Sequence, residues 1–128
     1  MVSDAWRSAP PHPVFAALRR IDVRSSWYEV YEVAPDTVAI CEPKQFEEVF
    51  AFLLLGSDRA LLVDTGMGLE PILPIVRQLT PLPVTVLNTH THFDHIGGNW
   101  EFERVLGFDT PQARAQQAGG ERELWVEQ

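Results

Sequence analysis

The sequence contains one cysteine and few basic residues, and each shortage excludes a class of protein. Cys41 is the only cysteine among 128 residues, so neither an intrachain disulfide nor a cysteine-rich zinc knuckle can form. Ten lysine and arginine residues stand against eighteen aspartate and glutamate residues, which gives a formal net charge of −8. This excess of negative charge argues against nucleic acid, or an anionic membrane surface, as the main partner.

Long apolar runs are also absent. The longest, Val49–Leu55, is too short to cross a bilayer. The N-terminal residues MVSDAWRSAPPHPVF lack the basic-then-apolar order of a signal peptide. We therefore expect a protein without membrane association that resides in the cytoplasm. Hydrophobic residues make up 45% of the chain, which is enough to pack one small domain or part of a larger one.

Proline marks the first part of the chain. Pro10, Pro11 and Pro13 favour extended backbone, and residues 1–26 are expected to form a tail or lead-in. Within them, residues 14–20 suit either a short helical turn or more of the lead-in. Residues 27–128 are expected to form the folded part.

From Trp27 onward, β-prone residues on either side of turn signals predict two hairpins. The first joins residues 28–33 to 37–41, and the second joins 50–55 to 60–63. The apolar residues of the second hairpin do not alternate with polar ones, which predicts strands buried on both faces.

The pattern then changes to helices and strands in alternation. Ile72, Ile75, Val76 and Leu79 share one face of a predicted helix. The further elements expected are a strand over 84–87, a helix over 96–103, a short strand over 105–108 and a helix over 110–119. An antiparallel-leaning sheet that acquires crossover helices belongs to the α/β or α+β class.

One segment, NTHTHFDHIGGN at residues 88–99, carries most of the chemistry. Three of the four histidines lie within six residues, beside an aspartate. A single histidine is often a hydrogen-bonded core residue, but that explanation does not cover three at this spacing. In an extended chain His90, His92 and Asp94 lie on one side and can converge, whereas His95 points elsewhere.

This donor set suits metal ions. Imidazole and carboxylate ligands together bind zinc, and also iron or manganese, without any thiolate. The segment would serve two adjacent metals, with two imidazoles for one and a carboxylate and an imidazole for the other. Such metals lower the pKa of bound water to about 7 and polarise carbonyl or phosphoryl oxygens. Hydrolysis is therefore the expected chemistry.

The segment HTHFDH, residues 90–95, resembles the H-x-H-x-D-H signature of the metallo-β-lactamase superfamily. ALLVDTG, residues 60–66, resembles a second marker of that family, an apolar strand that ends in Asp-Thr-Gly. The resemblance covers about residues 27–118.

The resemblance implies roles for the residues of both motifs. His90 and His92 would bind the first metal, and Asp94 and His95 the second. Asp94 would also orient the attacking water. Asp64 would support the site from outside the ligand set; the alternative is a strand-end aspartate that accepts backbone hydrogen bonds.

The implied fold is a four-layer αββα sandwich of two similar halves, of which this chain, over residues 27–128, would be the N-terminal half. In the family the second half supplies a third histidine, a bridging aspartate and a last histidine. No histidine follows His95, and Asp109 is the only aspartate after Asp94. We favour a fragment of a longer protein over two alternatives. In one, another chain, such as a second copy in a homodimer, completes the site; in the other, the chain is a degenerate relative with weak metal binding.

The expected activity is that of a metal-dependent hydrolase, in which metal-bound hydroxide attacks an ester, thioester, lactone or similar small-molecule substrate. One or two zinc ions are the expected cofactors, and this chain alone is expected to be inactive. The alternative is a non-catalytic metal-binding or oligomerising half-domain, which does not need the missing ligands.

Overall fold

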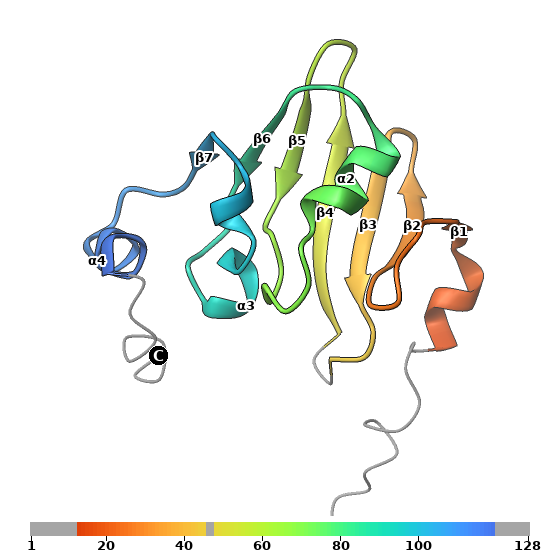
Figure 1. The fold of residues 1–128 in the computed structure, drawn as a ribbon, viewed down its shortest axis with the longest axis horizontal. Helices are drawn as coiled ribbons and strands as arrows, with labels where there is room; N and C mark the ends of the chain where they lie inside the picture. The colour runs from red at the N-terminus through yellow and green to blue at the C-terminus, as the bar shows by residue number, and fades with distance from the viewer. Residues whose placement is uncertain (1–12, 46–47, 120–128) are drawn as a thin grey trace, which may run out of the picture.

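A seven-stranded sheet, whose strand order follows the chain order, organises the protein (Figure 1). The computed structural model describes residues 13–45 and 48–119. The strands are β1 (Arg19–Ile21), β2 (Glu29–Ala34), β3 (Thr37–Glu42), β4 (Val49–Leu55), β5 (Ala60–Val63), β6 (Val84–Leu87) and β7 (Val105–Leu106). The pairs from β1 to β5 are antiparallel, and the pairs β5–β6 and β6–β7 are parallel.

Both predicted hairpins are present. β2 and β3 pair around Pro35 and Asp36, and β4 pairs with β5 around the predicted turn. Asp36 has a φ of 55°, a left-handed conformation that aspartate tolerates better than most residues. The turn chemistry of the sequence therefore sets the register of the antiparallel half of the sheet.

One face of the sheet packs against the helix α2 (Leu73–Leu79), which connects the parallel strands β5 and β6. The predicted helical stripe supplies Ile72, Ile75 and Val76, all at most 3% exposed. They pack against side chains from alternate positions of five strands, namely Val30, Ile40, Leu53, Leu62 and Val86. Fully burying each such side chain stabilises the fold by roughly 1.5–3 kcal/mol.

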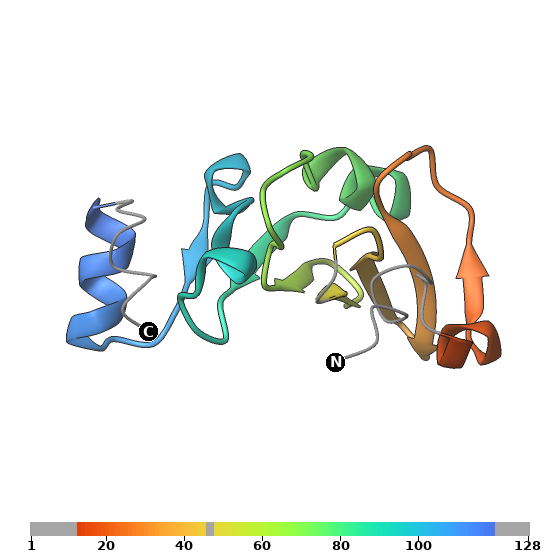
Figure 2. The same cartoon turned by 90° about the horizontal axis from the view of Figure 1, so that it is seen from below.

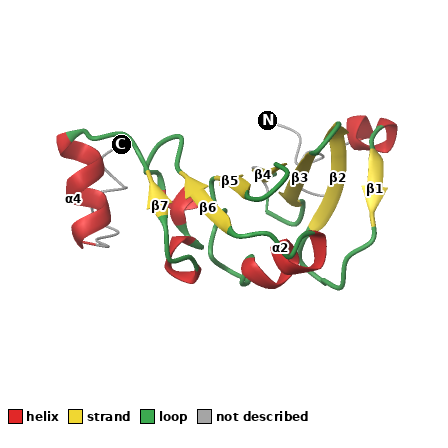
Figure 3. Cartoon of the chain, turned by 90° about the horizontal axis from the view of Figure 1, so that it is seen from above, coloured by secondary structure: helices red, strands yellow, loops and turns green. Residues whose placement is uncertain are grey.

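The opposite face of the sheet is largely open. Figures 2 and 3 show α2 on one side of the sheet and the short 3-10 helix η1 (Pro13–Ala17) on the other. Phe15 of η1 packs against Tyr31 and Cys41 at one end of this face. Phe52 and Leu54 of β4, however, are 38% and 40% exposed. The expectation that the second hairpin is buried on both faces was wrong, because no second layer covers these apolar side chains among the described residues.

One further expectation needs correction. In place of one helix over 96–103 there are two short turns, α3 (Phe93–Ile96) and the 3-10 helix η2 (Asn99–Glu101). Gly97 and Gly98 separate them, as expected from the poor helix propensity of glycine. In addition, β1 lies within the predicted lead-in and forms the edge of the sheet beside β2. The division of the chain at residue 27 stays a prediction.

The last described element, α4 (Pro111–Gly119), confirms the helix expected there. Its N-terminus is capped by Thr110, whose hydroxyl accepts the backbone N–H of Ala113 at 3.0 Å. In the described part of the chain, no helix combines the length and apolarity needed to span a bilayer.

The open face leads to a testable prediction about association. We expect the isolated chain to self-associate, because exposed apolar surface of this kind is stabilised by a covering layer. Replacing Phe52 and Leu54 together with lysine should shift the population toward monomer in sedimentation velocity over a range of concentrations. Leu69→Lys is the control, since Leu69 is 59% exposed and lies outside the sheet. A wild-type chain that sediments as a compact monomer at high concentration would contradict the prediction.

Candidate metal centre

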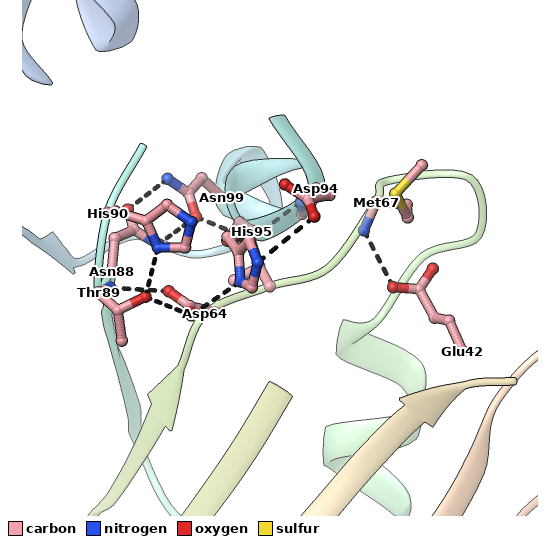
Figure 4. Close-up of polar contacts among 11 residues, drawn as sticks. Glu42, Asp64, Met67, Asn88, Thr89, His90, Asp94, His95 and Asn99 are labelled. Atoms are coloured by element: carbon pink, nitrogen blue, oxygen red, sulfur yellow. Dashed lines mark hydrogen bonds and ion pairs between the residues drawn. The ribbon is translucent and has the colours of Figure 1, made fainter. Parts of the chain in front are cut away.

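The candidate site lies where the parallel strands β5 and β6 end (Figure 4). Asp64 follows β5 directly, and Asn88 follows β6 directly. Parallel neighbours place their carboxyl ends at the same edge of a sheet, which is where open α/β sheets bind ligands. The topology therefore brings the two sequence motifs together although Asp64 and Asn88 are 24 positions apart in the sequence.

The imidazoles and carboxylates form two groups that share one residue. His90, His92 and Asp94 can place one ligand atom each within 4.8 Å of one another, and so can Asp64, His90 and His95. The ring centroid of His90 lies 4.6 Å from that of His92 and 4.2 Å from that of His95. The donor set and its spacing fit a metal ion such as zinc.

His95 differs from the sequence-based expectation, in which it pointed away from His90. The alternation of an extended chain stops at Phe93, where α3 begins. The backbone N–H of His95 donates to the carbonyl oxygen of His92 at 3.0 Å, so the chain turns and carries the His95 ring back to the cluster. That these residues bind metals, and which metal each would bind, stays a prediction.

Asp64 connects the strand end to the motif. Its carboxylate accepts the backbone N–H of Thr89 at 2.8 Å, the Thr89 hydroxyl at 2.7 Å and Nδ1 of His95 at 3.0 Å. Burial acts to raise the pKa of Asp64, but the hydrogen bonds from His95 and Thr89 outweigh it and hold the pKa below its usual value. The two alternatives expected for Asp64 are therefore both present: it accepts a backbone N–H, from Thr89, and it contacts a candidate ligand, His95.

The backbone of Asp64 is itself unusual. Its φ of 65° is left-handed, a conformation that costs a non-glycine residue energy and is common at functional sites. Next to it, Gly66 lies against the motif, since its carbonyl oxygen accepts the N–H of Gly97 at 2.8 Å. A Cβ on Gly97 would meet the carbonyl carbon of Met67 at 2.2 Å. Glycine is therefore required where the two loops touch.

The electrostatic environment of His90 favours the form that binds metals. Partial burial, and then the neighbouring His95 and His92, lower the pKa of His90 below its usual value. Imidazole must be neutral to act as a ligand. The cluster of three histidines thus helps to keep His90 ready for a metal near neutral pH.

Sequence reasoning missed the buried carboxylate of Glu42, at the end of β3. Glu42 is 1% exposed and accepts the indole N–H of Trp27 at 2.7 Å and the backbone N–H of Met67 at 3.0 Å. It supports the loop after Asp64 from the side opposite the motif (Figure 4). The sequence does indicate that Glu42 is buried, because side chains alternate along a strand and Glu42 shares a face with the core residues Val38 and Ile40.

A pair of hydrogen-bonded amides was also missed. The side chains of Asn88 and Asn99, the first and last residues of NTHTHFDHIGGN, donate to each other at 3.1 and 2.8 Å. The hydroxyl of Thr65 donates to Oδ1 of Asn99 at 2.8 Å. The segment that carries the candidate ligands is therefore a loop closed at its two ends. Its signal in the sequence is the matching asparagines that bracket the motif.

Glu42 generates a prediction about pH. Burial, together with the negative charge of Asp94, raises the pKa of Glu42, although the hydrogen bonds from Trp27 and Met67 oppose this. Stability that depends on protonated Glu42 is present below the usual glutamate pKa of about 4.3 and is lost as pH rises through the raised pKa. In urea unfolding of metal-free protein, the stability advantage of wild type over Glu42→Gln should therefore be about 1–3 kcal/mol near pH 4 and smaller near pH 7. An advantage that grows with pH would show instead that the two donors stabilise the ionised carboxylate.

The sequence around this centre matches a known family. The sequence model of the Metallo-beta-lactamase superfamily matches residues 45–111, which is more than half of the chain. The chain belongs to the Metallo-beta-lactamase superfamily. The resemblance of the two motifs is confirmed at the level of the family.

The chain is similar in sequence to curated proteins from animals and bacteria. Acyl-coenzyme A thioesterase MBLAC2 of Gallus gallus is 36% identical over 63 residues, which cover 42% of this chain and 23% of that protein. Hydroxyacylglutathione hydrolase of Xanthomonas euvesicatoria pv. vesicatoria (strain 85-10) is 38% identical over 60 residues, which cover 46% of this chain and 23% of that protein. The match thus spans about a quarter of the length of each relative.

Solved structures of the Metallo-beta-lactamase superfamily share the fold. A metallo-beta-lactamase from Erythrobacter litoralis aligns with a TM-score of 0.57 at 18% identity, over 75% of this chain and 47% of that one. MEM-A1, a subclass B3 metallo-beta-lactamase from a soil metagenome library, aligns with a TM-score of 0.54 at 25% identity, over 72% of this chain and 36% of that one. The predicted fold class is confirmed, and the chain corresponds to less than half of either structure.

Proposed function

We propose that this chain is the metal-binding N-terminal part of a metal-dependent hydrolase, with zinc as the cofactor. The observation that supports this most directly is the pair of ligand groups at the carboxyl ends of β5 and β6, which share His90. Superfamily membership agrees with it, and both curated relatives are named as hydrolytic enzymes. Iron or manganese would suit the same ligands.

Within this proposal, His90 and His92 hold the first metal and Asp94 and His95 hold the second. When bound, zinc supplies an activated water and polarises the bond that is to be hydrolysed. Asp94, whose carboxylate oxygen lies 3.4 Å from Nε2 of His95, orients the attacking water. Asp64 orients His95 through the hydrogen bond to Nδ1.

The proposed substrate is a small molecule with an acyl bond, such as an ester, a thioester or a lactone. A thioester is favoured, because one similar protein is named a thioesterase and the other a hydrolase of hydroxyacylglutathione. The net charge of −8 agrees with a small-molecule substrate rather than a nucleic acid.

Catalysis requires ligands beyond those in this chain. Four candidate ligands come from one segment, and no histidine follows His95. We propose that the rest come from a C-terminal half-domain that covers the open face of the sheet, or from a second copy in a homodimer. The chain alone, which spans about a quarter of its curated relatives, is then inactive.

The open face also supports a second candidate function, a metal-binding module that oligomerises without catalysis. Phe52 and Leu54 are exposed on that face, and a second copy of the chain would cover them without supplying any further ligand. The two candidate functions differ in whether bound metal leads to turnover. Zinc bound without turnover of any thioester, ester or lactone would favour the module, provided the assembled complex is the form assayed.

The metal ligands are tested by metal content and turnover. Wild-type protein, purified without chelator, should contain zinc, and His92→Ala should lose most of it together with any thioester hydrolysis by the complete assembly. His12→Ala is the control, because His12 is the one histidine outside the motif. Unchanged zinc content and unchanged turnover in His92→Ala would rule out metal catalysis at this site.

A further inference from the structure

The loop after β6 contains a hydroxyl group that lies between a carboxylate and a candidate metal ligand. Oγ1 of Thr89 is 2.7 Å from Oδ2 of Asp64 and 2.8 Å from Nδ1 of His90. Both distances are those of hydrogen bonds. Hydrogen bonds therefore connect three side chains from two strand ends in a row, from Asp64 through Thr89 to His90 (Figure 4).

The hydrogen atoms in this row can be placed from simple chemistry. An ionised carboxylate has no hydrogen to donate, so the single hydrogen of the Thr89 hydroxyl must point to Asp64. Asp64 also accepts the backbone N–H of Thr89 and faces Nδ1 of His95, so both of its oxygens act as hydrogen-bond acceptors. Oγ1 of Thr89 can then only accept from His90, which requires that Nδ1 of His90 carries the ring hydrogen.

We propose that Thr89 is a positioning residue that fixes the tautomer of His90, so that Nε2 of His90 is the nitrogen presented to a metal ion. A neutral imidazole has one nitrogen that carries a hydrogen and one that does not. The group that accepts the hydrogen decides which nitrogen remains free to bind a metal ion.

The same carboxylate has this effect on two candidate ligands. It accepts Nδ1–H of His95 directly at 3.0 Å, and it acts on His90 through the hydroxyl of Thr89. The backbone N–H of Thr89 also donates to Oδ1 of Asp64 at 2.8 Å, which keeps the hydroxyl in place. Partners outside the ligand set commonly fix the ring orientation and tautomer of metal-binding histidines, and their loss costs about 10- to 100-fold in metal affinity.

Two substitutions separate the hydroxyl from the shape of the side chain. Thr89→Val keeps the branched shape and the backbone hydrogen bond to Asp64 but removes the hydroxyl. Thr89→Ser keeps the hydroxyl and removes a methyl group. Thr85→Val makes the same chemical change on β6, outside the candidate site, and serves as the control.

The first readout is the tautomer of His90 in metal-free protein, measured from the ¹⁵N chemical shifts of the two ring nitrogens at a pH where the ring is neutral. Wild type, Thr89→Ser and Thr85→Val should carry the hydrogen on Nδ1. In Thr89→Val the population should shift toward hydrogen on Nε2. Wild type with the hydrogen on Nε2, or an unchanged tautomer in Thr89→Val, would overturn the proposal.

The second readout is zinc affinity, measured by competition with a chromophoric chelator; it rests on the proposed function. Thr89→Val should bind zinc about tenfold more weakly, and Thr89→Ser within about twofold of wild type. Equal affinity in Thr89→Val and wild type would show that the tautomer does not matter for the metal. A wild-type chain that binds no zinc would contradict the proposed function, whereas the tautomer measurement would still decide the role of Thr89.

Discussion

The arrangement at the edge of the sheet depends on the carboxylate of Asp64. It ends β5 in a left-handed conformation that costs about 1–3 kcal/mol, and its three hydrogen bonds to Thr89 and His95 compensate. Those bonds join the end of β5 to the loop after β6 and to α3. No hairpin or continuous helix connects these three segments directly. Two candidate ligands, His90 through Thr89 and His95 directly, are thereby held by one residue, and Asp64 itself is only 5% exposed.

Around this carboxylate, a network of polar side chains holds the histidine segment in shape. The amides of Asn88 and Asn99 close the loop, and Thr65 ties it to the end of β5. Glycines at positions 68 and 97 let the two backbones touch. A site organised in advance loses less conformational entropy when a ligand binds, because the ordering has already taken place during folding.

The sequence predicted the features that depend on neighbouring residues. Both hairpins, the apolar stripe of α2 and the bounds of β6 follow from local periodicity and turn chemistry. The strand pattern did not predict the open face, because an apolar strand does not reveal where its covering layer lies; that expectation came only from the resemblance to one half of a sandwich. The direction of His95 was missed because it depends on the start of α3. Glu42 and Thr89 were missed because their partners lie 25 residues away along the chain, at Met67 and Asp64, where no local pattern records the contact.

The match between strand order and chain order has a consequence for synthesis. Each strand pairs with the strand made just before it, from β1 to β7. Most of the sheet therefore needs only short loops to close, which favours rapid folding, and the antiparallel part can form while the rest of the chain is still being translated. The segment with the histidines follows β6 in this order, so it assembles on strands β1 to β6, which are already in place.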